Sequence, residues 1–124
     1  MRILVVKLAD VGDVLTATPA MRSLRRTFPN ARITALVAPH CAGLIAATGL
    51  VDETLSFDKW AGAPRVGLAL GLRRRRFDAM LLLHHLTNSA GVLKYAGLAT
   101  AAGAPIRAGL DNGRGWFLTH RAPD

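Results

Sequence analysis

Two short polar segments hold the residues whose types and spacing could do chemistry. Gly12-Asp13 follows an apolar run and precedes an amphipathic stretch, and His84-His85 with Asn88-Ser89 follows a second apolar run. In parallel α/β sheets, ligands collect beyond the carboxyl ends of the strands, near the point where the strand order reverses. We therefore expect both segments to lie on one rim of a sheet.

Asp13 permits two interpretations. Aspartate is among the preferred residues for capping the free N–H groups at the start of a helix. The same carboxylate, held ionised by the helix end, could instead accept a proton from a substrate hydroxyl. The residues alone favour the cap, although the two roles can coexist.

The remaining polar residues at this rim leave structure and function open. His84, His85, Asn88 and Ser89 could fix loop backbone or contact a substrate. No metal is expected, because no standard ligand spacing joins the aspartates and histidines gathered here. The loop before Gly12 lacks the G-x-G-x-x-G glycines and the chain lacks a P-loop, which argues against a nicotinamide or flavin cofactor.

The densest charge run is Arg73-Arg74-Arg75-Arg76. Such a run is usually a solvated helix end, where cations are favoured by the helix macrodipole. Nucleic-acid binding would require basic residues interleaved with aromatics, and aromatic residues make up only 6% of the chain. Cys41 lies among alanines and glycines and is expected to be a small buried residue.

Strands and helices alternate along the sequence, which predicts a doubly wound α/β layer with right-handed crossovers. Apolar and β-branched runs predict strands over residues 2–7, 32–37, 53–57, 77–84 and 106–110, with the fourth strand central. Helices are expected over 39–48, 63–76 and 89–102, together with one that starts either near Asp13 or at Thr18, before Pro19. The trio 116–118 has no predicted element after it that could bury it.

Composition limits the class of protein. The 124 residues, of 13.2 kDa, are 51% hydrophobic and 19% charged, which fits one folded domain and neither a disordered nor a membrane-embedded chain. A single cysteine excludes a disulfide framework and fits a reducing cytoplasm. The net charge of +8 favours an anionic partner without naming it.

The amino-terminal half of the chain resembles glycosyltransferase family 9, the family of the ADP-heptose lipopolysaccharide heptosyltransferases. The resemblance runs through residues 1–58 and continues more loosely from Phe77. It rests on a set of short segments: Arg2 to Lys7, Gly12-Asp13-Val14-Leu15, Thr18-Pro19, Leu24-Arg25, Phe28-Pro29, Ala31-Arg32-Ile33 and Leu36-Val37. This chain has His84 and His85 where many members carry an acidic or glutamine-glycine pattern, which leaves the acceptor open.

The resemblance implies the GT-B architecture, in which two Rossmann-like domains face a cleft, and an inverting sugar transfer that needs no metal. Asp13 falls on the family's general base, and Gly12 would let the acceptor approach. Together with Gly12, the polar residues expected at the rim, Lys7, His84, His85, Asn88 and Ser89, are the candidate acceptor-binding residues. Residues 1–124 would form the amino-terminal, acceptor-side domain of such an enzyme.

The resemblance also implies partners. The donor would be a nucleotide-sugar, an ADP-sugar, bound by a carboxyl-terminal domain that this chain does not contain, so we expect the chain alone to be inactive. The acceptor would be a lipopolysaccharide-core or related glycan or glycolipid, reached in the cytoplasm with peripheral contact to the anionic inner face of the plasma membrane. The alternative is a non-catalytic α/β module that binds a polyanion such as RNA, although nucleic acid is the weaker expectation.

Overall fold

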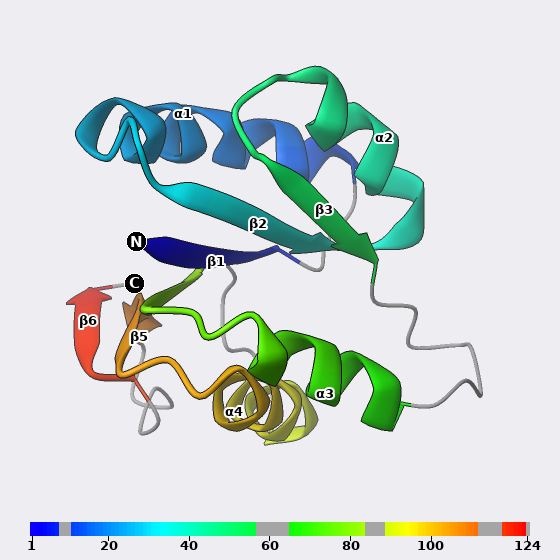
Figure 1. The fold of residues 1–124 in the computed structure, drawn as a ribbon, viewed down its shortest axis with the longest axis vertical. Coiled ribbons are helices and arrows are strands. Elements are labelled where there is room, and N and C mark those ends of the chain that lie inside the picture. The colour runs from blue at the N-terminus through cyan, green and yellow to red at the C-terminus, as the bar shows by residue number, and fades with distance from the viewer. Residues whose placement is uncertain (8–10, 57–64, 84–88, 112–117, 124) are drawn as a thin grey trace.

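The computed structural model describes the backbone of residues 1–7, 11–56, 65–83, 89–111 and 118–123. Within these ranges the side chains of residues 11–16, 65–69, 89–94, 110–111 and 121–123 lie outside the description. Strands and helices alternate over most of the chain (Figure 1). They are β1 (Arg2–Lys7), α1 (Val11–Thr27), β2 (Arg32–Val37), α2 (Pro39–Ala47), β3 (Glu53–Ser56), α3 (Arg65–Arg74), β4 (Ala79–Leu82), α4 (Ser89–Ala102), β5 (Ile106–Asp111) and β6 (His120–Pro123).

All described strands form one parallel sheet in the order β3-β2-β1-β4-β5-β6. Ile3 of β1 lies opposite Ile33 of β2 on one side and Ala79 of β4 on the other. The strand order therefore reverses between β1 and β4. As the sequence predicts, β4 is central in the sheet. Its neighbour β1 consists of the buried apolar run that a strand covered on both faces requires.

Helices cover both faces of the sheet, with α1 and α2 on one side and α3 and α4 on the other (Figure 1). Because side chains alternate along a strand, Ile3 and Val5 of β1 enter the core beneath α1 and α2, whereas Leu4 and Val6 enter the core beneath α3 and α4. Cys41 is fully buried in the first of these cores, as predicted.

The end of the chain differs from the prediction. The strand β6 pairs with β5 where the sequence suggested only a turn-rich tail. Leu118, just before it, is buried against the α3–α4 core, so the expectation that this residue lacks an element to bury it is wrong. Trp116 and Phe117 lie outside the described residues.

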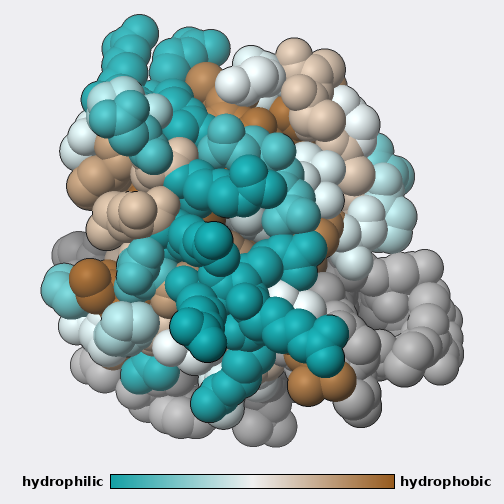
Figure 2. All heavy atoms as spheres, in the orientation of Figure 1, coloured by the Kyte–Doolittle hydropathy of each residue, from teal (hydrophilic) through white to brown (hydrophobic). Residues whose placement is uncertain are grey.

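Polar side chains form a band through the middle of the surface seen in Figure 2, between the two helical layers. Within the part of the chain that the structure describes, no helix combines the length and the apolar character needed to cross a membrane.

Candidate functional site

The reversal of strand order places the carboxyl ends of β1 and β4 side by side. β1 ends at Lys7 and β4 ends at Leu82, and the backbone pairing continues one residue further, since the Leu83 N–H donates to the Val6 carbonyl at 3.0 Å. The helices that follow, α1 and α4, begin at Val11 and Ser89. We call the ends of these two strands and the first turns of these two helices the switch-point rim. Ligands of open α/β sheets bind at such a crevice.

Asp13 is the third residue of α1, and Gly12 is the second. The helix thus starts near Asp13, one of the two predicted starts, and continues through Pro19. Asp13 is not the N-cap, because a cap residue stands outside the helical backbone whereas Asp13 lies within the first turn. The positive end of the helix macrodipole favours the ionised form of a carboxylate at this position. The contacts of the Asp13 side chain lie outside the description.

Lys7 is the last residue of β1 and retains only 9% of its exposure. Positions 3, 5 and 7 of a strand share one face, so the Lys7 side chain lies with Ile3 and Val5 on the sheet face that α1 covers. Buried lysines are rare unless they are paired. Neither of the two ion pairs found within the described residues includes Lys7. Lys7 therefore places a positive charge beneath the switch-point rim.

Only some of the predicted site residues lie within the part of the chain that the structure describes. Ser89 is the first residue of α4, as predicted, so its backbone lies at the rim. His84, His85 and Asn88 lie outside the described residues, and the central strand ends at Leu82, earlier than the predicted residue 84. Among the described residues no group of three or more histidines, cysteines or carboxylates could hold a metal ion.

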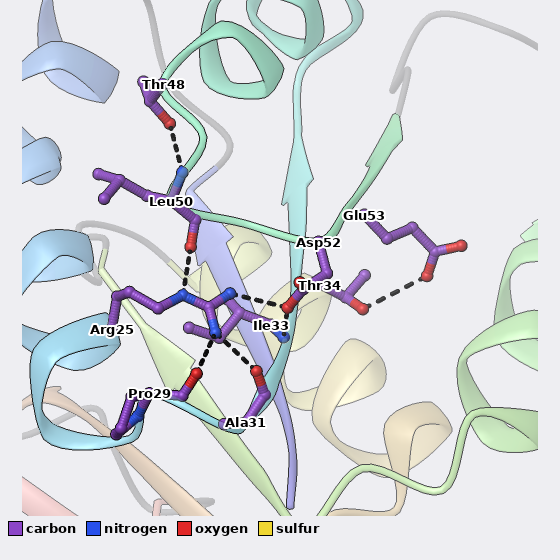
Figure 3. A network of polar contacts seen from close by, with 9 residues as sticks. All are labelled: Arg25, Pro29, Ala31, Ile33, Thr34, Thr48, Leu50, Asp52 and Glu53. Carbon is purple, nitrogen blue, oxygen red and sulfur yellow. Dashed lines mark hydrogen bonds and ion pairs between the residues drawn. The ribbon is translucent and has the colours of Figure 1, made fainter.

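The orientation of α1 depends on Arg25, a residue whose role the sequence analysis missed. Figure 3 shows its guanidinium enclosed by acceptors from the turns before β2 and β3. Nε donates to the Leu50 carbonyl at 3.1 Å, Nη1 to the carbonyls of Pro29 at 3.4 Å and Ala31 at 2.7 Å, and Nη2 to Asp52 Oδ2 at 2.7 Å. Arg25 therefore links the carboxyl end of α1 to the turns before β2 and β3. This is the helix end opposite to the one that bears Asp13.

Two carboxylates stabilise this amino-terminal edge of the sheet. Asp52 Oδ2 also accepts the Ile33 N–H at 2.8 Å, and this hydrogen bond, followed by the one from Arg25, lowers the pKa of Asp52. The carboxylate of Glu53 pairs with Arg75 at 2.8 Å, which lowers the pKa of Glu53 and raises that of Arg75. Hydrophobic periodicity places Arg25 on the solvent side of α1, but the only sequence signal for this network is an acidic pair at the start of β3.

The strand order, the two helical layers and the polar segments at the reversal define a doubly wound, Rossmann-like α/β domain. The fold class predicted from the sequence is thereby confirmed.

Several known glycosyltransferases resemble this chain in both fold and sequence. The structure of Escherichia coli ADP-heptose lipopolysaccharide heptosyltransferase II matches with a TM-score of 0.77 and 27% identity, over 100% of this chain and 35% of that one. A glycosyl transferase family 9 structure from Veillonella parvula matches with a TM-score of 0.77 and 26% identity, over 98% of this chain and 35% of that one.

Comparison with curated sequences agrees. Lipopolysaccharide heptosyltransferase 2 from Escherichia coli (strain K12) is 30% identical over 118 residues, which cover 90% of this chain and 34% of the relative. The chain thus spans about a third of the length of the relatives it matches. No protein-family model matches the chain. The predicted resemblance to glycosyltransferase family 9 is confirmed by these relatives.

Proposed function

We propose that this chain is the acceptor-side domain of an inverting glycosyltransferase of family 9. The similarity to heptosyltransferases over nearly the whole chain supports this assignment. The observation that supports it best is the position of Asp13, in the first turn of α1 where the strand order reverses, which is where a crevice for a ligand is expected.

In the proposed mechanism the Asp13 carboxylate is the general base. It takes the proton from an acceptor hydroxyl as the hydroxyl oxygen attacks the anomeric carbon of the donor sugar. The new bond joins that oxygen to the anomeric carbon, and the bond between the anomeric carbon and the diphosphate oxygen breaks on the opposite face, which inverts the configuration. The nucleoside diphosphate leaves with the electrons of the broken bond. The helix end keeps Asp13 ionised until the proton arrives.

Residues around Asp13 would hold the acceptor. Gly12 would leave room for the acceptor at the helix start. Lys7 would supply a positive charge beneath the rim, which favours an acceptor that carries a phosphate or carboxylate group. His84, His85, Asn88 and Ser89 belong to the proposed acceptor site through their place after β4. The acceptor class is a lipopolysaccharide-core or related glycan, in keeping with the names of the relatives.

The donor and the location follow from the same proposal. An ADP-sugar would bind to a separate donor domain, as the name ADP-heptose lipopolysaccharide heptosyltransferase of one relative suggests. Transfer would then require both domains, and the isolated chain would be inactive. A glycolipid acceptor would bring the enzyme to the cytoplasmic face of the plasma membrane, as a peripheral protein.

Titration of the ¹⁵N-labelled chain with a lipopolysaccharide-core oligosaccharide tests the acceptor role. We expect saturable shifts of the backbone amides of Lys7, Gly12, Asp13 and Ser89, because these residues border the switch-point rim. Addition of an ADP-sugar should yield no transfer product from this chain. Shifts confined to other regions, or turnover by the isolated chain, would contradict the proposal.

A further inference from the structure

A second feature lies at the opposite edge of the sheet. An open cavity of about 590 Å³ is lined by Arg73, Arg74, Arg76, Phe77, Asp78, Ala102 and Gly103. We call it the arginine cavity. Its residues end α3 and α4 and precede β4 and β5, so it lies at the amino-terminal ends of these strands. A strand of six residues spans roughly 20 Å, so the cavity and the switch-point rim are separate sites.

The charge of the lining is positive. Three guanidinium groups face one carboxylate, that of Asp78, whose Oδ2 already accepts the Arg2 N–H at 2.8 Å. The carboxyl ends of α3 and α4 contribute partial negative charge, about half an elementary charge each, which reduces the surplus without cancelling it. Glu53, the acid of β3, is not in the lining and is paired with Arg75.

The arginines of the cavity differ in what they already bind. Arg73 Nη1 donates to the Thr100 carbonyl at 3.3 Å and thereby satisfies a carbonyl in the last turn of α4. For Arg74 and Arg76, the described residues provide no hydrogen bond or ion pair to the guanidinium. Both of these side chains are exposed, so their donors are available to a ligand.

The backbone of Arg76 supplies an independent argument. Its φ is 52°, and within the described residues it is the one non-glycine with a positive φ. The helix that ends on the other side of the cavity, α4, is followed by Gly103 with a φ of 66°, the residue type that adopts this conformation without steric cost. Two residues after the end of α3, at Arg76, the chain adopts this conformation with an arginine. Strained conformations retained at a surface turn are a reason to look for function.

We propose that the arginine cavity binds a phosphate-bearing anion. Guanidinium groups recognise phosphate oxygens through paired, charge-assisted hydrogen bonds, and the cavity volume falls within the ~300–1,000 Å³ typical of small-molecule sites. The one aromatic residue of the lining, Phe77, is only 4% exposed and offers no face for a base to stack on. The site therefore selects for phosphate groups and against single-stranded nucleic acid. This inference does not depend on the proposed function.

The test is titration with sodium pyrophosphate at fixed ionic strength, followed by the amide signals of residues 73–78 and 102–103. Wild-type protein should show saturable binding. Arg76→Gly and Arg74→Gln should each weaken it by about tenfold or more, since each removes a charge-assisted contact. Arg22→Gln removes an exposed arginine of α1, outside the cavity, and should leave binding unchanged. This control separates a defined site from diffuse charge.

Arg76→Gly has a second expected effect. It removes the strain at a positive φ and should raise Tm by about 3 °C while it weakens binding, whereas Arg76→Gln should weaken binding without this gain. A gain in stability that accompanies a loss of binding excludes misfolding as the cause of the loss.

Vesicles distinguish the source of the phosphate. Binding to phosphatidylglycerol vesicles but not to pyrophosphate, lost in Arg76→Gly, would support the site and assign its ligand as a lipid headgroup. Equal weakening by Arg22→Gln and Arg76→Gly would overturn the proposal, as would absence of binding to both probes. So would RNA binding that falls steeply with salt and is equally sensitive to every arginine, because that pattern indicates a non-specific polyanion surface.

Discussion

Two carboxylates at the amino-terminal edge of the sheet, Asp52 and Glu53, make the stability of the protein sensitive to acid. Asp52 joins the start of β2 to α1 through the Ile33 N–H and Arg25, and Glu53 joins β3 to the end of α3 through Arg75. Both carboxyl groups have a pKa below the ordinary values of 3.8 and 4.5. The folded state therefore binds their protons less readily than the unfolded state does. Their contribution to stability is complete above the ordinary values and is lost as the pH falls through the lowered ones.

Asp52→Asn should reduce this contribution. At pH 7 we expect the free energy of unfolding to fall by only ~0.5 kcal/mol, because the Asp52 side chain is 39% exposed and its ion pair is screened. Urea midpoints measured between pH 7 and pH 2.5 provide the check. The difference between wild type and variant should shrink as the pH falls below the ordinary pKa of 3.8 and then through the lowered pKa of Asp52 in the folded state. A difference that stays constant down to pH 2.5 would contradict the assigned role of the charge.

Among the helices and strands, the sequence predicts those whose apolar pattern or capping residues are local to the element. The apolar runs of β1 and β2 are found over the predicted residues, and so is α4, which begins at Ser89 and is followed by Gly103. The strand β6 has no such signal, since it is a short edge strand formed by pairing with β5. The contacts of Arg25 have no local signal for a related reason, because its partner Asp52 lies 27 residues away and periodicity cannot reveal the pairing.

The packing of β5 beneath Leu118 gives a test at this scale. A Cβ added at Gly109 would lie 3.2 Å from the Leu118 Cδ1, the Leu82 Cβ and the Leu82 carbonyl oxygen. Gly109→Ala should therefore destabilise the protein by ~1–3 kcal/mol, measured by urea unfolding. Gly97→Ala is the control, because a Cβ there meets nothing within 4 Å and alanine favours the helix α4 by ~1 kcal/mol. Equal effects of the two variants would argue against the described packing of β5, β4 and Leu118.

For the molecule as a whole, the length of the strands separates two proposed binding sites, the switch-point rim and the arginine cavity. The switch-point rim combines the starts of α1 and α4, whose helix ends favour anions. The amino-terminal edge gathers the arginines in the last turn of α3 and just after it. The sequence allowed the rim to be placed, because the carboxyl ends of parallel strands share one edge. It did not reveal the arginine cavity, since that cavity requires α3 and α4 to end side by side.

The chain spans only about a third of the length of the relatives it matches. In our proposal, sugar transfer therefore requires a donor domain in addition to this one. The donor domain would bind the nucleotide-sugar, whose nucleoside diphosphate leaves. This domain would bind the acceptor and supply the base. In this proposal Asp13 is the one side chain of this domain that takes part in the chemical step. Its removal should lower the rate of transfer far more than the stability of the fold.

The most direct test is the rate of sugar transfer by Asp13→Asn, in a protein that joins this domain to its donor domain. We predict that kcat falls by about 10²–10⁴-fold, as expected for loss of a general base, while the free energy of unfolding changes by no more than ~1 kcal/mol. Asp52→Asn, which alters stability at the opposite edge, should retain the wild-type rate. Transfer by Asp13→Asn within a few-fold of wild type would contradict the account.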